Sequence, residues 1–365
     1  MTDRADRLAD LVAEAGLDAL IVGDLVRPGD SGPDARANVY WLTGFSGTSG
    51  IAVVGADRRE FLTDFRYTER ARDEVAEEFE QITLQGRLVA GLAKNLSGRV
   101  GFDDATTSVR SLGQLEKAVA EGVELVATNG LVEKLRRVKD AGEVEAIAEA
   151  SRLADEVFEW LAGRPLVGRT EAEVALEIEA RVRELGAEPS FPTIVAGGPN
   201  GSLPHAEPGD REIGAAELVV VDMGAKLDGY CSDGTRTFAS GEIGAEDREI
   251  YELVRAAQQV SLDAIRAGLG GAEADAVSRE PIEGAGHGDH YGHGLGHGVG
   301  LEVHEAPRLG KTSEDVLVAG DVVTVEPGVY VPGRCGVRIE DLVVVAEEGV
   351  RNLSATSKEL RIAGS

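Results

Sequence analysis

The chain has 365 residues, more than one ordinary hydrophobic core contains, and this length predicts two domains. Hydrophobic residues make up 42% of the sequence, a share typical of globular proteins. The formal charge of −28 excludes nucleic acid and anionic membrane as main partners, because both bind basic surfaces.

Cysteine usage and the N-terminal sequence indicate the compartment. The two cysteines, Cys231 and Cys335, are too few for a disulfide framework, which favours a reducing environment. The first residues are charged and lack the basic start and apolar segment of a signal peptide. No run reaches the ~18 apolar residues of a membrane span. We therefore expect a cytoplasmic protein.

The first third of the sequence alternates between helical and strand patterns. Helical spacing of apolar residues predicts a helix over residues 4–16, and the apolar run 18–22 predicts a buried strand. The segment 27–36 is rich in Pro, Gly and Asp, which predicts a loop. Strands are expected at residues 39–42, 51–54 and 60–62. The alternation continues to about residue 127 and predicts a compact α/β domain.

The pattern changes near Val132, where we place the boundary between domains of residues 1–131 and 132–365. Asp140 with Glu143, and Thr170 with Glu173, match capping boxes and predict two helix starts. A third helix is predicted over residues 245–267. Strand-like runs then occupy residues 217–222, 235–239, 322–326 and 341–345. We expect an α+β domain in which helices accompany a largely β site region.

Histidines gather in one part of the second domain. All six lie after residue 204, and five fall within residues 287–304. Glycine alternates with histidine in this run, which lets the backbone bring imidazoles close to a shared point. An adventitious metal-binding tract is the alternative interpretation.

Asp222 and Asp233 form a first pair of acids. Asp222 ends the apolar run 218–221, and the turn at residues 226–229 predicts a hairpin that returns Asp233 to a place opposite it. Two like charges held together raise each other's pKa unless a cation neutralises them. The alternative is a pair of capped turn aspartates, a role that also suits Asp228.

Glu326 and Glu340 form a second pair. Glu326 ends the run 322–325, and Glu340 follows the strand-like residues 337–339. A lone charge on such a strand is costly or shifts its pKa. Glu340 taken alone also fits a simple ion pair with Arg338.

Four acids and one histidine make an oxygen-rich ligand set, which favours Mn(II), with Co(II), Zn(II) and Fe(II) as alternatives. Four carboxylates exceed what one divalent ion needs. Two ions about 3.5 Å apart are therefore the better interpretation.

The order and spacing of these residues resemble the M24 "pita-bread" metallopeptidases, in particular the Xaa-Pro aminopeptidase and Xaa-Pro dipeptidase (prolidase) branch. The matching strings are DGYCSD at residues 228–233, GHGVGLEVHE at 296–305, VEPG at 325–328 and RIED at 338–341. The string NVYWLTGFSG at 38–47 resembles the creatinase-type N-terminal domain. The resemblance implies an α/β N-terminal domain followed by an α+β pita-bread catalytic domain.

The resemblance also implies metal ligands. Asp222 would chelate one ion, His297 would bind the other, and Asp233 and Glu340 would bridge both. Glu326 would bind the second ion and act as general base toward a bridging hydroxide nucleophile.

Further residues match substrate-side positions of the family. His205 would bind substrate near the proline side of the cleft, His304 would steady the oxyanion, and His293 would line the pocket. Arg338 would lie next to the ligand Glu340 without binding metal itself. His287 and His290 match no ligand role and are expected in a surface loop.

These implications favour an aminopeptidase that removes the residue before a proline from peptides with a free N-terminus. An Xaa-Pro dipeptidase is the alternative, and a metal-free creatinase-like hydrolase or a non-enzymatic binding module are further ones. The N-terminal domain also implies a homodimer, with Trp41, Phe45 and the segment 27–36 as candidates for its edge.

Overall fold

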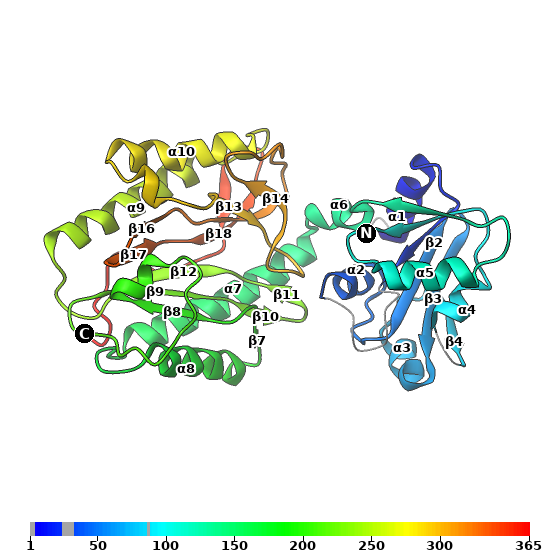
Figure 1. Cartoon of the computed structure of the whole chain (residues 1–365), viewed down its shortest axis with the longest axis horizontal. Helices are drawn as coiled ribbons and strands as arrows, with labels where there is room; N and C mark the ends of the chain where they lie inside the picture. Colours follow the sequence, from blue (N-terminus) through cyan, green and yellow to red (C-terminus); the bar gives the residue numbers. More distant parts are fainter. Residues whose placement is uncertain (1–3, 24–32, 86–87) are drawn as a thin grey trace. The chain divides into compact units, whose positions relative to one another are not determined.

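The computed structural model describes residues 4–23, 33–85 and 88–365, and the chain divides into two compact units, Met1–Arg136 and Arg137–Ser365 (Figure 1). The helix α6 (Leu131–Arg137) ends at this division. The sequence places the boundary near Val132, at the start of the same helix.

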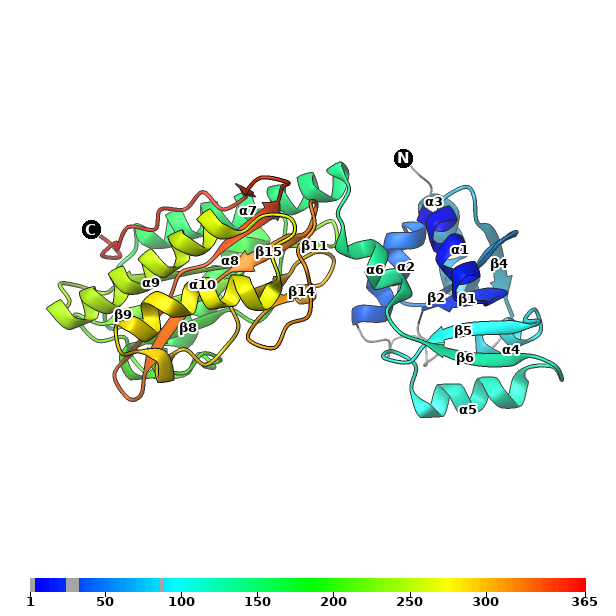
Figure 2. The same cartoon turned by 90° about the horizontal axis from the view of Figure 1, so that it is seen from above.

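The N-terminal unit is built on a mixed sheet of six strands in the order β4-β3-β2-β1-β5-β6. Helices pack on both faces of this sheet (Figure 2). The strands are β1 (Ala19–Val22), β2 (Gly50–Gly55), β3 (Arg58–Asp64), β4 (Glu80–Leu84), β5 (Arg99–Asp103) and β6 (Glu124–Thr128). The helices before α6 are α1 (Arg4–Glu14), α2 (Pro33–Thr43), α3 (Thr68–Glu74), α4 (Leu88–Ala93) and α5 (Val109–Ala118).

The predicted strands at residues 18–22, 51–54 and 60–62 are confirmed, but the strand at 39–42 is wrong. These residues belong to α2, where the Thr43 hydroxyl donates to the Val39 carbonyl at 2.7 Å and the helix ends before Gly44. Val39, Trp41 and Leu42 are all buried, so the run lacks the apolar stripe that distinguishes a helix. The predicted loop 27–36 fails at its last four residues, which begin α2; residues 27–32 lie outside the described residues.

Two packed layers of helix and sheet form the C-terminal unit (Figures 1 and 2). One pair of helices, α7 (Ala141–Ala162) and α8 (Glu171–Glu184), buries apolar residues against the sheet β12-β9-β8. The other pair, α9 (Ala245–Ala264) and α10 (Gly271–Gly284), packs near the sheet β14-β13-β15-β18-β19 and the ribbon β16-β17.

The strands of this unit are short and antiparallel wherever they pair in these sheets. They are β7 (Glu188–Pro189), β8 (Ile194–Gly197), β9 (Leu218–Met223), β10 (Ala225–Leu227), β11 (Tyr230–Cys231), β12 (Gly234–Ala239), β13 (Gly296–Gly298), β14 (Glu305–Leu309), β15 (Val322–Val325), β16 (Gly328–Val331), β17 (Cys335–Arg338), β18 (Asp341–Val345) and β19 (Val350–Asn352). Short 3₁₀ turns are η1 (Phe65–Tyr67), η2 (Gly198–Ser202) and η3 (Gly288–His290).

Both predicted capping boxes are present and start α7 and α8. The third predicted helix is α9, which ends at Ala264, three residues before the predicted end. The sequence does not predict α10 (Gly271–Gly284), because Pro281 inside it and the glycines around it are typical helix breakers.

The predicted hairpin between Asp222 and Asp233 is present, but it contains a second, smaller hairpin. Strands β9 and β12 pair with Asp222 opposite Thr235, and a smaller hairpin of β10 and β11 is inserted between them. Asp228 and Gly229 make its turn with φ of 47° and 87°, which matches a two-residue turn of the primed type. The insertion leaves Asp233 just before β12, beside the end of β9.

Candidate metal centre

Three acids converge where the central strands end. Asp222 lies on β9, Asp233 precedes β12 and Glu340 lies between β17 and β18. One carboxylate oxygen from each lies within 4.8 Å of the others, and Asp233 and Glu340 are buried. The Thr235 hydroxyl fixes Glu340 by donating to its Oε2 at 2.7 Å.

His297 and Glu326 complete the cluster from the other sheet. His297 lies on β13, whose register shifts between His297 and Gly298, and such a bulge redirects a side chain. Its Nε2 lies 3.6 Å from Asp233 Oδ2 and 3.3 Å from Glu326 Oε1. The structure therefore brings together all five residues of the predicted ligand set.

Charge crowding shifts the pKa values of these acids. Burial, and then the charge of Glu340, holds the pKa of Asp233 well above its usual range, and burial with Glu326 does the same for Glu340. Burial also raises the pKa of Glu326, but the hydrogen bond and charge of His297 outweigh it and set this pKa at about 2. Without a cation, the surroundings of Asp233 and Glu340 therefore favour their protonated forms.

Two features of the cluster fit divalent cations. Asp222 Oδ1 and Glu340 Oε1 are buried and accept no hydrogen bond among the described residues, an arrangement that a bound cation would relieve. His297 Nδ1 lies 3.1 Å from the Gly298 carbonyl, which only accepts, so Nδ1 carries a proton. That leaves Nε2 to face the acids as a metal ligand would.

Arg338 connects this cluster to the pocket. Its guanidinium is buried and donates to Asp222 Oδ2 at 2.5 Å, to the Thr235 hydroxyl at 2.9 Å and to the Tyr330 hydroxyl at 2.8 Å. The Tyr330 hydroxyl lies 2.9 Å from His293 Nε2. Arg338 therefore holds Asp222 directly, whereas the resemblance implies a position next to Glu340.

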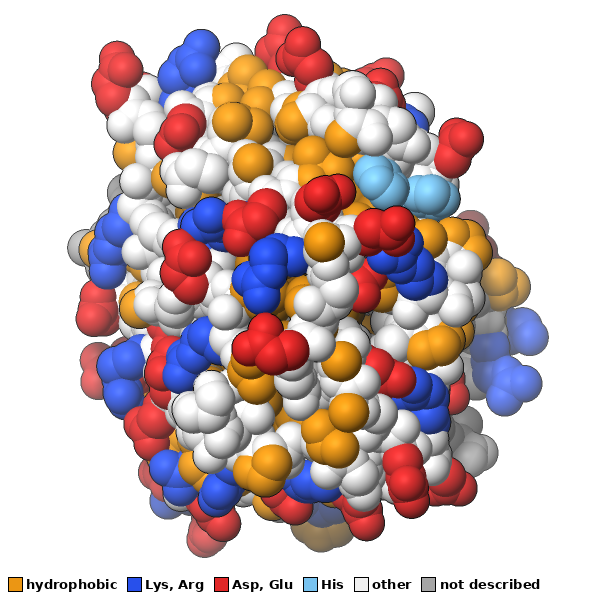
Figure 3. Space-filling model, turned by 90° about the vertical axis from the view of Figure 1, so that its left-hand side faces the viewer, with side chains coloured by type: hydrophobic (Ala, Val, Ile, Leu, Met, Phe, Trp, Pro, Cys, Tyr) orange, Lys and Arg blue, Asp and Glu red, His pale blue; other side chains and the backbone are white. Residues whose placement is uncertain are grey.

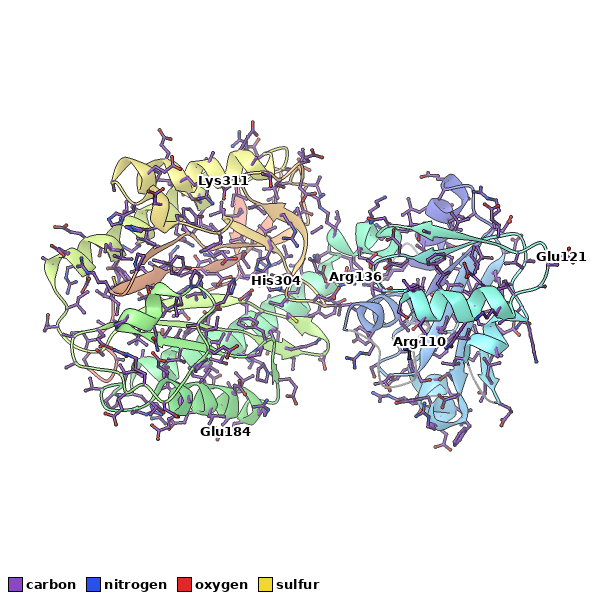
Figure 4. All side chains as sticks on the ribbon, viewed as in Figure 1. Arg110, Glu121, Arg136, Glu184, His304 and Lys311 are labelled. Atoms are coloured by element: carbon purple, nitrogen blue, oxygen red, sulfur yellow. The ribbon has the colours of Figure 1, made fainter. Side chains whose placement is uncertain are left out.

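The two other predicted substrate-side histidines, His205 and His304, line a cleft of about 1110 Å³ together with the five acidic and imidazole residues of the cluster. His304 is exposed just before β14 (Figure 4). Its ring centroid is 4.3 Å from that of His297. His293 also lines the cleft.

His287 and His290 lie apart from the acid cluster. Their Nδ1 atoms lie 3.0 Å apart, and both side chains are partly buried, with His290 the last residue of η3 and His287 just before it. The expected surface loop is therefore only partly exposed. The face of the C-terminal unit shown in Figure 3 carries Asp and Glu among Lys and Arg, in keeping with the acidic composition.

Two basic side chains of the cleft wall are not among the residues that the sequence predicts for the site. Arg308 and Lys311 line the same cleft as the acids. Neither side chain makes an ion pair or hydrogen bond with the described part of the chain. Arg308 follows His304 by four residues on β14, a spacing that could have drawn attention to it.

Both cysteines are free and buried. Within the described ranges, no helix is long and apolar enough to cross a membrane.

Comparisons with known proteins match both units. The metallopeptidase family M24 matches residues 145–347, and the creatinase/prolidase N-terminal domain matches residues 4–138. An Xaa-Pro dipeptidase of Pyrococcus furiosus is 34% identical over 371 residues, covering 99% of this chain and 100% of the relative. An uncharacterized peptidase of Bacillus subtilis is 39% identical over 364 residues, covering 98% and 99%.

Solved structures agree. An Xaa-Pro dipeptidase from Bacillus anthracis superposes with a TM-score of 0.91 at 38% identity and covers 98% of each chain. An X-Pro aminopeptidase from Thermotoga maritima gives 0.89 at 32% identity, covering 98% of this chain and 99% of the other.

The two-unit fold and the acid-rich cleft thus define a metallopeptidase of the pita-bread class. The chain belongs to metallopeptidase family M24 and carries a creatinase/prolidase N-terminal domain. The predicted family and fold class are confirmed.

Proposed function

We propose that the protein is a metal-dependent Xaa-Pro dipeptidase, which hydrolyses the bond between a first residue and a C-terminal proline. This replaces the aminopeptidase that the sequence favours. One full-length relative with 34% identity and one solved structure with 38% identity bear the name Xaa-Pro dipeptidase, which supports the change.

The observation that carries the dipeptidase proposal is Arg308. Its guanidinium lines the cleft that contains the acid cluster, and no carboxylate of the described chain pairs with it although the protein is strongly acidic. A dipeptide ends in a free carboxylate one residue beyond the scissile bond, and guanidinium binds carboxylate with two parallel hydrogen bonds. Arg308 is therefore a suitable partner for the proline carboxylate.

Two divalent cations, Mn(II) by preference, would be held by Asp222, Asp233, His297, Glu326 and Glu340. Bound ions supply an acidified water and a polarised carbonyl. The fit rests on the buried oxygens without a hydrogen-bond donor and on the Nε2 of His297, which faces the acids.

The protein groups have separate tasks in this proposal. Glu326 accepts the proton of the attacking water as general base. His304 donates a hydrogen bond to the carbonyl oxygen as negative charge develops there. The free amine of the substrate binds beside Asp222, which Arg338 holds in place through Oδ2.

Specificity for proline follows from the substrate's shape. An Xaa-Pro bond is a tertiary amide without an N–H, and the ring fixes φ. His205 and His293 flank the place of the ring in our proposal. A substrate with alanine in that position would lose the ring contacts and gain conformational freedom, so it should be hydrolysed poorly.

An Xaa-Pro aminopeptidase is the second candidate. The cleft has a volume of about 1110 Å³, whereas small-ligand pockets typically have about 300–1,000 Å³. The cleft therefore has room for a longer peptide. The likeness to the Thermotoga maritima structure also supports it. A metal-free hydrolase or a binding module is less favoured, because the whole acid set is present and converges.

The test compares Leu-Pro, Leu-Pro-Ala, Leu-Ala and N-acetyl-Leu-Pro with the Mn(II)-loaded protein. We expect kcat/KM for Leu-Pro to exceed that for Leu-Pro-Ala by about 10-fold or more, and little turnover of the other two. Faster hydrolysis of the tripeptide would establish the aminopeptidase instead. Equal hydrolysis of Leu-Ala would contradict both.

We further propose a cytoplasmic location, in keeping with the free cysteines. Peptides with a free N-terminus would be its partners, and the protein would form a homodimer.

A further inference from the structure

The side chain of His304 has few contacts of its own. It lies in residues 299–304, which we call the His304 loop, between β13 and β14. Its ring is exposed and packs on the His297 ring, and it makes no hydrogen bond within the described chain. The place of this imidazole therefore depends on how the backbone of its loop is held.

The carboxylate of Glu305 holds that backbone from inside the loop. Its Oε1 accepts the Glu302 N–H at 3.1 Å, while the Gly300 N–H donates to the Glu302 carbonyl at 3.0 Å. Gly300 leaves the space for this carboxylate, because an added Cβ there would lie 2.7 Å from both Glu305 oxygens. The loop is thus folded around the side chain that follows His304.

Lys139 anchors Glu305 from the start of the C-terminal unit. Its Nζ lies 3.1 Å from Glu305 Oε2, and the two side chains are 1% and 8% exposed. The Lys139 N–H donates to the Gly320 carbonyl at 3.0 Å, so the backbone that carries the lysine is itself fixed. Loss of one partner of such a buried pair is costly, because the remaining charge loses a favourable interaction that offset its desolvation.

We propose that Lys139 and Glu305 are positioning residues that hold the His304 loop so that the imidazole faces the metal cluster. Neither touches the reacting atoms in this proposal. The part that concerns turnover rests on the proposed peptidase function, whereas the part that concerns loop order does not.

The experiment uses K139M, K139R, E305Q and G300A in the full-length Mn(II)-loaded protein, with R137M as matched control. Arg137 forms a comparable ion pair from the same segment, with its guanidinium 2.8 Å from the fully buried Asp321. Its polar partners in the described chain, Asp315, Val316 and Asp321, lie outside the His304 loop. H304A gives the effect of losing the imidazole altogether, and we expect it to lower kcat by roughly 10²- to 10⁴-fold.

For K139M and G300A we expect kcat on Leu-Pro to fall by about 10- to 100-fold, with KM changed less than about threefold. Metal content should stay at the wild-type value. K139R should restore kcat to within about fivefold of wild type, because it keeps the charge. R137M should keep wild-type kcat even if its melting temperature falls. E305Q, which keeps the shape of Glu305, serves as the second variant if K139M does not fold.

Hydrogen exchange of the peptide spanning residues 299–305 gives a readout independent of turnover. K139M and E305Q should speed exchange there, whereas R137M should not. Unchanged exchange and unchanged kcat in the Lys139 and Glu305 variants would overturn the proposal, as would equal effects of R137M. If the wild-type protein hydrolyses no Xaa-Pro peptide, the proposed function fails while the exchange result still decides the loop.

Discussion

At the residue scale, the acids and histidines were accessible from sequence because each ends an apolar run or lies in a dense motif. Asp222 and Glu326 both follow strand-like valines, and the structure brings them into one cluster with His297. Tyr330 and Thr235 carried no such signal. Their part arises because β16 pairs with β17 and β9 with β12, and those registers place both hydroxyls against Arg338.

Tyr330 joins Arg338 to His293 through one hydroxyl. His293 Nδ1 lies 2.7 Å from the Gly294 carbonyl and so carries the proton, which leaves Nε2 to accept from the tyrosine. Burial raises the pKa of Tyr330 to about 12, so the hydroxyl keeps its proton at working pH. We expect Y330F to lower kcat/KM about 10-fold with metal content unchanged, measured by kinetics and elemental analysis. Loss of metal would show that Tyr330 mainly supports Asp222.

Arg308 provides the residue-scale test of substrate length. If its guanidinium binds the proline carboxylate, R308Q should raise KM for Leu-Pro by about 10- to 100-fold. This change corresponds to the binding free energy of a hydrogen bond between charged groups. KM for Leu-Pro-Ala should change less, since that carboxylate lies one residue further on. K311Q is the matched control, because Lys311 lines the same cleft. Equal losses on both peptides would remove the support that Arg308 gives to the dipeptidase.

At the element scale, capping boxes and helical periodicity predict helices correctly, whereas runs of buried residues do not distinguish a helix from a strand. The boxes at Asp140 and Thr170 set α7 and α8 because side chain and backbone satisfy each other locally. The sequence of α2 predicts a strand because its buried residues do not follow the spacing of one helix face. The helix α10 is not predicted because Pro281 lies inside it. Tertiary packing decides these two helices, and no local pattern reports it.

Asp64 at the end of β3 gives an element-scale prediction for pH. Its hydrogen bonds from Arg66, against the opposing effect of burial, lower the pKa to about 2 from 3.8, and Ser49 also donates to it at 2.6 Å. Because the folded pKa lies below the unfolded one, this stabilisation is complete above about pH 4 and is lost as pH falls toward 2. We expect about 1 kcal/mol after allowing for the half-exposed Arg66.

Urea unfolding between pH 5 and about pH 2 measures this effect. The sequence contains only two tryptophans, Trp41 and Trp160, so W160F leaves Trp41 to report on the N-terminal unit. In that background D64N should remove the acid-dependent loss assigned to Asp64. An unchanged pH slope would show that other carboxylates dominate.

At the scale of the whole molecule, two of the predicted candidates for the edge of a homodimer are wrong, whereas the segment 27–36 stays a prediction because residues 27–32 lie outside the described residues. Trp41 and Phe45 are buried within the N-terminal unit, so they cannot form a contact surface. Phe65 and Val109 of the same unit are 71% and 89% exposed and are better candidates. We expect light scattering to give twice 38.3 kDa at micromolar concentration, and F65E to lower that mass. A wild-type mass near 38.3 kDa would exclude the dimer.

Metal binding should be linked to pH and to the stability of the C-terminal unit. Without cations, burial and the neighbouring carboxylates raise the pKa values of Asp233 and Glu340, so cations compete with protons for these carboxylates. Metal affinity should therefore fall as pH is lowered from 8 to 5.5, and bound metal should raise the melting temperature by mass action. We expect about two Mn(II) ions per chain by elemental analysis, and no activity after chelation.

Asp233 and Asp228 provide a matched pair for that prediction. Both are aspartates of the same hairpin region, but Asp228 lies in the turn with φ of 47°, a conformation that asparagine tolerates. D233N should lower metal affinity by at least 10-fold and reduce its pH dependence, whereas D228N should change neither. Calorimetric titration of the apo proteins with Mn(II) at pH 6 and 8 measures both. If D233N bound two ions as tightly as wild type, Asp233 would not be a ligand and the two-ion centre would need another bridging group.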